Sequence, residues 1–349
     1  MKRRSLCLFV LGLSLLLSAV VLLSCRLLFP AISYPVATPS NEALVVRIPA
    51  GASLREIGDR LQAAGLISHA RLFSAYAALL GVGRKIRAGE YRISPRMTSP
   101  AILSLLVSGA VILHPLTFRE GLTIDGVTEI NRQSGLVQAD EFQEVVRGRE
   151  LLAEANLPGE NMEGYLFPDT YLFRLGTGGR EAAKAMLREF LRVRKRVDEQ
   201  ESAGTALSPY EELILASMIE KETGIGAERP MISAVFHSRL RQDMLLQCDP
   251  TVIYALGAGF DGVLGKDELA LDSPYNTYRF RGLPPGPICN PGRASLEAAR
   301  RPAEVDYLFF VARPDGTHTF SRTLEEHNSA VDIQQALRAL HDRNRALGR

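Results

Sequence analysis

The chain has 349 residues, of which 46% are hydrophobic and 23% are charged, and its formal net charge is +2. This is the balance of an ordinary globular protein, and the length is sufficient for two or three small domains. The near-neutral charge excludes the strongly basic surface that is typical of nucleic-acid-binding proteins, so we expect no nucleic-acid partner.

The N-terminus predicts a membrane anchor. Residues 5–24, SLCLFVLGLSLLLSAVVLLS, contain no charge and follow the basic stretch MKRR. About 20 apolar residues span a bilayer as a helix, and basic residues before them place the N-terminus in the cytoplasm. We therefore expect a cytoplasmic tip and transmembrane helix in residues 1–29. Two alternatives stay open: a lipoprotein signal, because LLSC ending at Cys25 loosely resembles a lipobox, and a cleaved signal peptide.

A small α+β module is predicted after a linker. Residues 30–42 form a Pro- and Ser-containing spacer. Residues 43–112 then show alternating strand and helix patterns, with Ser53 and Glu56 at the spacing of a capping box and Ser99 at the start of a helix. No catalytic cluster is evident in this module. The expected elements are a strand at 43–48, helices at 53–65 and 70–81, a strand at 89–93 and a helix at 99–109.

Residues 113–205 connect this module to the remainder of the chain. Their most unusual stretch is NMEGYLFPDTY, residues 161–171, in which Gly, Pro and aromatic residues surround Glu163 and Asp169. Residues 182–196 predict a very basic helix, and the simplest interpretation of its charges is a solvated face.

The last region, residues 206–349, contains the helix with the clearest start signal. Ser208 precedes Pro209, and Glu211 lies three residues after Ser208, which is a capping-box pattern. The helix continues as LILASMIEKETG and is expected to end at Gly224. Further helices are predicted from ERP onward and at about residues 323–344, with turn-rich loops between them.

Two glutamates, Glu220 and Glu222, end the apolar run of this helix. Leu215, Met218 and Ile219 form a stripe that Glu222 continues, since residues three, four and seven apart share a helix face. Glu220 falls about 140° from Leu215. We therefore expect Glu222 to point inward and Glu220 to be exposed or structural.

An inward Glu222 would have a raised pKa. Burial raises the pKa of a carboxyl, and the last turn of a helix disfavours negative charge. A glutamate that is still protonated near neutral pH has the property that a general acid requires. The alternative is a buried Glu222 that forms an ion pair with an arginine such as Arg239 or Arg279.

Three later loops are rich in Pro, Gly and polar residues: QCDPT, SPYNTY and GLPPGPICNPG. Asn, Gln, Thr and Tyr match the hydroxyl and acetamide groups of a sugar chain, and loops stiffened by Pro often carry binding groups. The alternative is that these clusters are only tight turns. The predicted groove-lining residues are Glu163, Asp169, Gln247, Asp249, Asn276, Thr277 and Tyr278.

Other chemistries lack a signal in the sequence. No HExxH spacing, G-x-S-x-G elbow, phosphate loop or dinucleotide fingerprint occurs, so we expect neither a metal nor a cofactor. Cys7 and Cys25 belong to the anchor region. Cys248 and Cys289 could form a disulfide in an exported domain or remain two buried thiols, and the sequence leaves both possibilities open.

The motifs ASMIEKETG, SPYNTY, GLPPGPICNPG and HTFSRTLEEHN, in this order, resemble the endolytic murein transglycosylase family, also called YceG-like. EGYLFPDTY and FREGLTIDGV fit the same family, and the resemblance extends from about residue 44 to the C-terminus. It implies an N-terminal transmembrane helix, a LysM-like α+β module and a larger α+β YceG-like catalytic domain. It also implies that the catalytic acid is the second Glu of E-K-E-T, which is Glu222.

Family members cleave the β-1,4 bond between N-acetylmuramic acid and N-acetylglucosamine and leave 1,6-anhydro ends. The resemblance therefore implies a lytic transglycosylase of the bacterial inner membrane, with an extracytoplasmic catalytic domain, that terminates nascent glycan strands beside peptidoglycan synthases. Two other functions remain open. One is a water-using muramidase with Glu163 or Asp169 as its second carboxylate, and the other is a non-catalytic, membrane-anchored peptidoglycan-binding scaffold.

Overall fold

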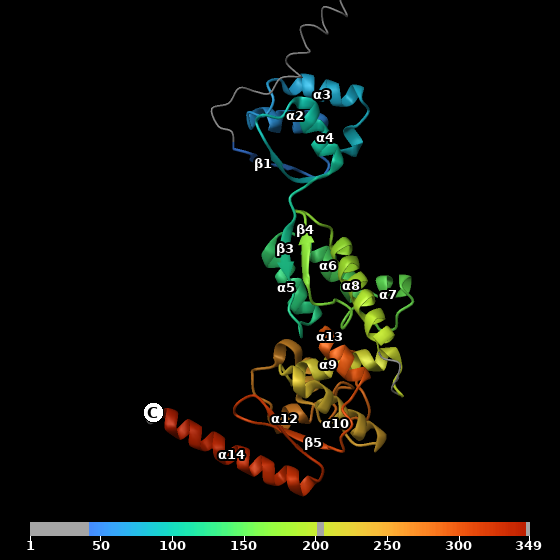
Figure 1. The fold of residues 1–349 in the computed structure, drawn as a ribbon, viewed down its shortest axis with the longest axis vertical. Coiled ribbons are helices and arrows are strands. Elements are labelled where there is room, and N and C mark those ends of the chain that lie inside the picture. Colours follow the sequence, from blue (N-terminus) through green and yellow to red (C-terminus); the bar gives the residue numbers. More distant parts are fainter. Residues whose placement is uncertain (1–41, 201–205, 347–349) are drawn as a thin grey trace, which may run out of the picture. The chain divides into compact units, whose positions relative to one another are not determined.

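The computed structural model describes residues 42–200 and 206–346, which belong to two compact units (Figure 1). The expected anchor and most of the linker lie outside the described residues. Within the described part of the chain, no helix combines the length and apolar character needed to cross a bilayer. Of the described residues, unit 1 comprises 42–114 and Leu172–Gly176, and unit 2 comprises Pro115–Tyr171, 177–200 and 206–346.

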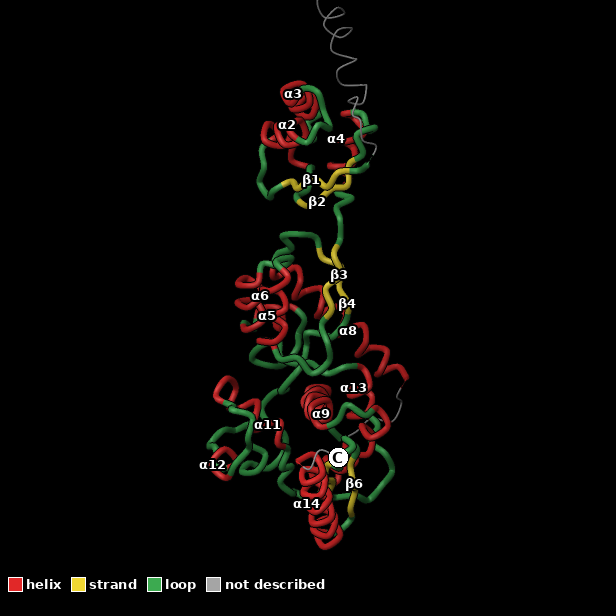
Figure 2. The backbone as a smooth tube through the Cα atoms, turned by 90° about the vertical axis from the view of Figure 1, so that its left-hand side faces the viewer, coloured by secondary structure: helices red, strands yellow, loops and turns green. Residues whose placement is uncertain are grey.

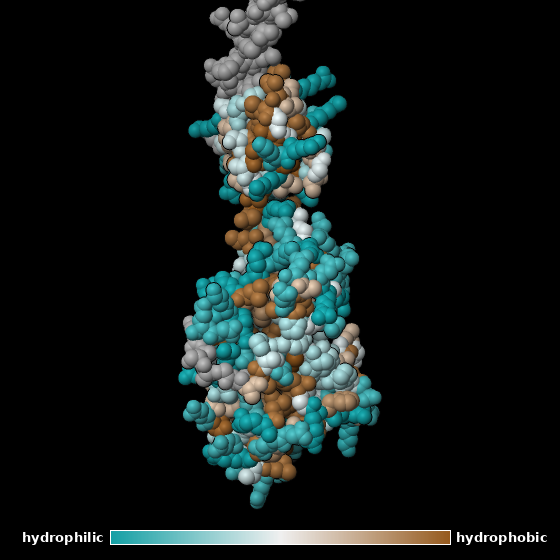
Figure 3. Space-filling model, turned by 90° about the vertical axis from the view of Figure 1, so that its right-hand side faces the viewer, coloured by the Kyte–Doolittle hydropathy of each residue, from teal (hydrophilic) through white to brown (hydrophobic). Residues whose placement is uncertain are grey.

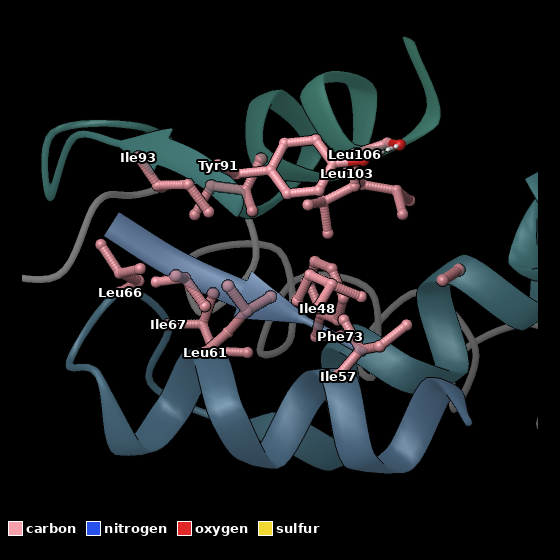
Figure 4. Close-up of a cluster of buried hydrophobic side chains, with 13 residues drawn as sticks. Ile48, Ile57, Leu61, Leu66, Ile67, Phe73, Tyr91, Ile93, Leu103 and Leu106 are labelled. Carbon is pink, nitrogen blue, oxygen red and sulfur yellow. Dashed lines mark hydrogen bonds between the residues drawn. The ribbon is translucent and has the colours of Figure 1, made fainter. Parts of the chain in front are cut away.

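Unit 1 is the small α+β module. Its two strands pair in antiparallel register, with Val46 opposite Tyr91. Figure 4 shows side chains from both strands and from the helices converging on one apolar core. The buried Tyr91 hydroxyl donates to the backbone oxygen of Arg87 (2.7 Å), so its polar end is satisfied. The elements are β1 (Leu44–Ile48), α2 (Leu54–Ala63), α3 (Ala70–Leu79), η1 (Gly83–Lys85), β2 (Gly89–Ile93) and α4 (Ser99–Ser108).

Two helix starts in unit 1 differ in detail from the sequence expectation. Ser53 accepts a hydrogen bond from the Glu56 backbone, but the Glu56 side chain bonds Arg60 instead of closing a capping box. Helix α4 is capped by the Thr98 hydroxyl, with Ser99 as its first residue. Both helices nevertheless begin within one residue of the expected position.

The rest of the described chain is mainly helical, with short two-stranded sheets (Figure 2). β3 pairs with β4, and β5 pairs antiparallel with β6. Polar side chains surround smaller apolar patches on the face in Figure 3, as is usual for a globular surface. The elements are β3 (His114–Thr117), α5 (Ile124–Ser134), α6 (Ala139–Arg147), α7 (Glu150–Glu154), β4 (Thr170–Phe173), α8 (Gly179–Gln200), α9 (Pro209–Glu222), η2 (Gly226–Glu228), α10 (Arg229–Arg241), α11 (Asp249–Leu256), η3 (Gly257–Gly259), α12 (Lys266–Leu269), α13 (Arg293–Arg300), β5 (Phe309–Ala312), β6 (His318–Ser321) and α14 (Leu324–Ala346).

Helix α9 lies at the centre of unit 2, packed against α10, α11 and α13. The expected capping box of Ser208 and Glu211 is present at its start. Residues 212–219 are all buried, so this helix has no solvent-facing side along those turns. The buried Glu212 carboxylate forms ion pairs with Arg194 and Arg300, which compensate its charge. The expected apolar stripe of Leu215, Met218 and Ile219 is buried, and so are the other faces of α9 along these turns.

Candidate active site

Glu222 is the last residue of α9 and is half-buried. Burial raises its pKa to about 7, and the negative charge of Asp249 adds to the rise. A hydrogen bond from the Cys248 side chain and the positive charge of Arg239 act in the opposite direction but do not cancel the rise. The sequence expectation of a raised pKa at this position is confirmed, with desolvation as its main cause.

No Lys, Arg or His in the described residues forms an ion pair with Glu222, so the alternative of a paired, structural Glu222 is not realised. Arg239 donates instead to the backbone oxygen of Leu246 (2.8 Å). Arg279 pairs with Asp272 (3.4 Å). A carboxylate without a cationic partner in a desolvated place holds a proton more readily than an ion-paired one.

The QCDPT loop and the SPYNTY loop are joined by hydrogen bonds through Thr277. The Gln247 backbone N–H donates to the Thr277 backbone oxygen (3.0 Å), and the Cys248 N–H donates to Thr277 Oγ1 (2.9 Å). Thr251 Oγ1 lies 2.9 Å from the same hydroxyl oxygen. Thr277 is 1% exposed, so its side chain belongs to the interior.

Asn276 has a similar internal role. Its side chain donates to the backbone oxygens of Leu269 (3.0 Å) and Leu271 (2.8 Å), and it accepts from the Tyr278 backbone N–H (3.0 Å). Asn276 is fully buried. The expectation that Asn276 and Thr277 line a sugar groove is therefore wrong, because both side chains are consumed in shaping the loops.

Asp249 and Tyr278 form a hydrogen-bonded pair that interacts electrostatically with Glu222. The Tyr278 hydroxyl donates to Asp249 Oδ1 (2.5 Å), and the charges of Asp249 and Glu222 both raise the pKa of Tyr278 beyond the rise caused by burial. Asp249 and Gln247 are exposed, with Gln247 in a left-handed backbone conformation (φ 48°). Asp249, Gln247 and Tyr278 thus all keep side-chain surface that a ligand can reach.

Glu163 lies in a different environment. It is 4% exposed and accepts from the Ile124 backbone N–H (3.1 Å), Asn290 Nδ2 (3.2 Å) and the Tyr254 hydroxyl (3.3 Å). Burial raises its pKa to about 7, although the hydrogen bonds from Ile124 and Tyr254 oppose the rise. Glu163 therefore ties together three segments of unit 2 and lines a cavity of about 550 Å³.

Among the described residues, no contact links Asp169 to Glu222 or to the residues around it. It is exposed, and its carboxylate accepts from the Thr170 backbone N–H (2.7 Å). Its backbone oxygen accepts from the Phe118 N–H (3.0 Å), which places it beside the end of β3. The prediction of Asp169 as a groove residue therefore finds no support in the geometry.

A model of the YceG-like family matches residues 46–333 of the chain. The chain belongs to this family. An endolytic murein transglycosylase of Bacillus subtilis (strain 168) is 34% identical over 320 residues, which cover 85% of this chain and 86% of the relative. Two pneumococcal proteins of the same name, from Streptococcus pneumoniae strains D39 and R6, are 29% and 30% identical over 85% of this chain, which spans 59% of their length.

A solved structure is also similar. A putative YceG-like protein from Listeria monocytogenes is 34% identical, with a TM-score of 0.54, over 83% of this chain and 100% of that one. The mixed α+β YceG-like fold is therefore shown for this chain as for its relatives.

In this YceG-like chain the two glutamates of E-K-E-T have different surroundings. Glu220 accepts from Gly292 N–H (2.9 Å), Ser295 Oγ (2.8 Å) and Arg229 Nη2 (3.1 Å), and its side chain is 6% exposed. It thus joins the end of α9 to the start of α13. The expectation of a structural Glu220 is confirmed, whereas an exposed side chain is not found.

Both cysteines of this YceG-like domain are free and buried, so the Cys248–Cys289 disulfide does not form. The Cys289 thiol donates to the Ser217 backbone oxygen (3.3 Å). Cys248 is the residue that the sequence interpretation missed, since it contacts Glu222. The available signal was its place next to Asp249 in the QCDPT loop.

Proposed function

We propose that this protein is an endolytic murein transglycosylase with Glu222 as its catalytic acid. The observation that carries the proposal is a carboxyl with a pKa of about 7, without an ion-pair partner among the described residues, at the end of a buried helix in a YceG-like chain. At pH 7 about half of such a group is protonated. It can donate a proton early in a reaction and accept one later.

The reaction begins at the β-1,4 bond between N-acetylmuramic acid and N-acetylglucosamine. Glu222 gives its proton to the glycosidic oxygen as the bond to C1 breaks, and an oxocarbenium-like transition state develops. The 6-hydroxyl of the same muramic acid attacks C1, and the ionised Glu222 removes its proton. The product is a 1,6-anhydro sugar, no water is consumed, and the acid returns to its starting state. Intramolecular attack has an entropic advantage over a positioned water.

Asp249 supplies negative charge beside the same site. Its carboxylate is oriented by the Tyr278 hydroxyl (2.5 Å). A fixed anion stabilises a positive charge that develops on the sugar and also keeps Glu222 protonated. The two effects favour the same step, so Asp249 is the residue that we expect to assist Glu222.

We also propose the cellular setting. The uncharged residues 5–24 after MKRR support a single-pass anchor in the bacterial inner (plasma) membrane, with the N-terminus cytoplasmic and the catalytic unit periplasmic or otherwise extracytoplasmic. Unit 1, whose elements follow the order strand, helix, helix, strand, helix, is proposed as a LysM-like module that contacts peptidoglycan. The substrate is the nascent glycan strand, and synthases of the penicillin-binding protein type are the proposed partners.

The test is cleavage of nascent, uncrosslinked glycan strands by the full-length protein in detergent, with products read by mass spectrometry. Wild type and the surface control Glu297→Gln are expected to give anhydro-ended fragments, and Glu222→Gln is expected to give fewer by about 100-fold or more. Glu297 forms only an exposed i,i+4 pair with Arg293, which contributes little. Ends heavier by one water would indicate a muramidase, for which Asp249, in place of the expected Glu163 or Asp169, is the carboxylate that acts on Glu222. No cleavage by wild type would favour the scaffold.

A further inference from the structure

Unit 2 contains a cavity of about 550 Å³ that the proposed proton transfers do not use. Its wall includes the start of α5, the end of α9 and one side of α11. Glu163, Tyr254 and Lys221 contribute polar groups, while Ile253 and Ile288 contribute apolar surface. This volume and mixed lining are typical of sites for small ligands, about 300–1,000 Å³.

Two residues of the cavity wall are chain neighbours of the site residues Glu222 and Asp249. Lys221, in its wall, directly precedes Glu222, and Pro250, also in its wall, directly follows Asp249. Consecutive Cα atoms are about 3.8 Å apart, and neighbouring side chains on a helix diverge by about 100°. The cavity therefore lies beside the position of the proposed bond cleavage rather than over it. A substituent on the sugar held at Glu222 is the part of the substrate that can enter it.

The charges of the cavity select an anionic ligand. Lys221 forms no ion pair with any described residue, and its ammonium makes one long contact with the Gly121 backbone oxygen (3.5 Å). The other cation of the wall, Arg147, already pairs with Asp125. The buried acid Glu163 is bonded by backbone and side-chain donors rather than by Lys221. The ammonium of Lys221 is thus the group that a ligand carboxylate can neutralise.

We infer that this cavity binds the peptide stem carried by the lactyl group of N-acetylmuramic acid, with Lys221 contacting a stem carboxylate. The inference rests on the proposed function, since the glycan places muramic acid at Glu222. A peptide stem begins at the sugar and combines small aliphatic side chains with free carboxylates. These groups match the apolar wall of Ile253 and Ile288 and the unpaired ammonium.

The first experiment compares glycan strands that carry stems with the same strands stripped by an amidase, using the full-length protein. Wild type is expected to have the higher kcat/KM on stem-bearing strands. Lys221→Met should reduce the ratio of the two kcat/KM values about tenfold, equivalent to about 1.4 kcal/mol, because the charged contact to the stem carboxylate is lost. Lys221→Arg should restore most of the ratio. The control Lys195→Met, at an exposed site on α8, should leave it unchanged.

Equal cleavage of both strands by wild type, or a ratio unaffected by Lys221→Met, would overturn the stem site and leave the transglycosylase proposal intact. A protein that cleaves neither strand would overturn the proposed function instead. The cavity is then judged by fluorescence anisotropy with a labelled free tetrapeptide stem. Binding by wild type and Lys195→Met that is weakened at least fivefold in Lys221→Met supports the site, and absent binding, or binding unaffected by Lys221→Met, rejects it.

Discussion

The Cys248 side chain donates a hydrogen bond to the Glu222 carboxylate. Burial raises the pKa of this thiol well above its usual value, and the charge of Glu222 raises it further, so Cys248 remains a neutral donor. Asp249, the next residue, acts on Glu222 in the opposite sense, since its negative charge favours the protonated carboxyl. Two consecutive residues of one loop therefore set the pKa of the proposed acid from opposite directions.

Asp249→Asn should move the pH profile of cleavage towards acid. In the wild type we expect kcat/KM to fall as the pH rises through about 7, because Glu222 loses the proton that it must donate. Removing the neighbouring anion stabilises ionised Glu222 and lowers its pKa. The measurement is kcat/KM against pH for both proteins. A profile with an unchanged alkaline limb would show that Asp249 does not act on Glu222.

Cys248→Ala should move the alkaline limb of the kcat/KM profile towards higher pH. The substitution removes a donor to the ionised carboxylate, so the pKa of Glu222 rises and activity persists to higher pH. Cys248→Ser keeps a donor and is the matched control, with a profile close to that of wild type. The prediction fails if the alanine variant shifts towards acid or if both variants shift equally.

Substituting the two glutamates of E-K-E-T should affect different properties: cleavage at Glu222 and stability at Glu220. Glu222→Gln should lower cleavage by about 100-fold or more, the range of general acid catalysis, without loss of stability, since it removes a desolvated and unpaired carboxyl. Glu220→Gln should lower the free energy of unfolding by about 3 kcal/mol, because it leaves the buried Arg229 with only its longer ion pair to Glu120 (3.8 Å). Urea denaturation and strand cleavage measure both quantities. Lost stability in Glu222→Gln together with lost cleavage in Glu220→Gln would show that Glu220 is the acid and Glu222 the structural residue.

Glu163 should make unit 2 less stable as the pH rises from about 4.5 to 7. Its pKa is raised from 4.5 to about 7 by burial, so between these values the folded protein binds more protons than the unfolded chain. Stability then falls with pH, by up to about 3 kcal/mol over the window. Glu163→Gln should flatten this dependence in urea midpoints measured from pH 5 to 8. The curve of Glu297→Gln should stay parallel to wild type, and a parallel curve for Glu163→Gln would refute the assignment.

Local elements could be predicted from the sequence because their signals are local. The capping box of Ser208 and Glu211 and the stop after Glu222 lie within a few residues of the helix ends that they define. The role of Glu220 could not be predicted this way, since its partner Ser295 lies 75 residues away. Helical periodicity favours Glu222 over Glu220 as the inward residue. Because α9 is buried on all sides along residues 212–219, periodicity alone carries little information there.

The predicted groove residues also depend on partners that their local sequence does not reveal. Asn276 and Thr277 have the composition of a sugar-binding loop, but the Asn276 side chain bonds the preceding backbone and the Thr277 side chain bonds the Cys248 backbone. Nothing in their own sequence distinguishes these two uses. Glu163 was selected for its unusual surroundings in the sequence, whereas its partners are 39, 91 and 127 residues distant. Tertiary contacts of this range decide which polar side chains face a ligand.

Helix α9, buried along residues 212–219, also determines how the site should respond to warming. Amide protons in such a segment exchange with deuterium only when much of the surrounding fold opens. The backbone that carries Glu222 should therefore be among the slowest-exchanging parts of unit 2. The proposed acid should keep its position until the unit melts as a whole, so that heat inactivation and global unfolding occur at the same temperature.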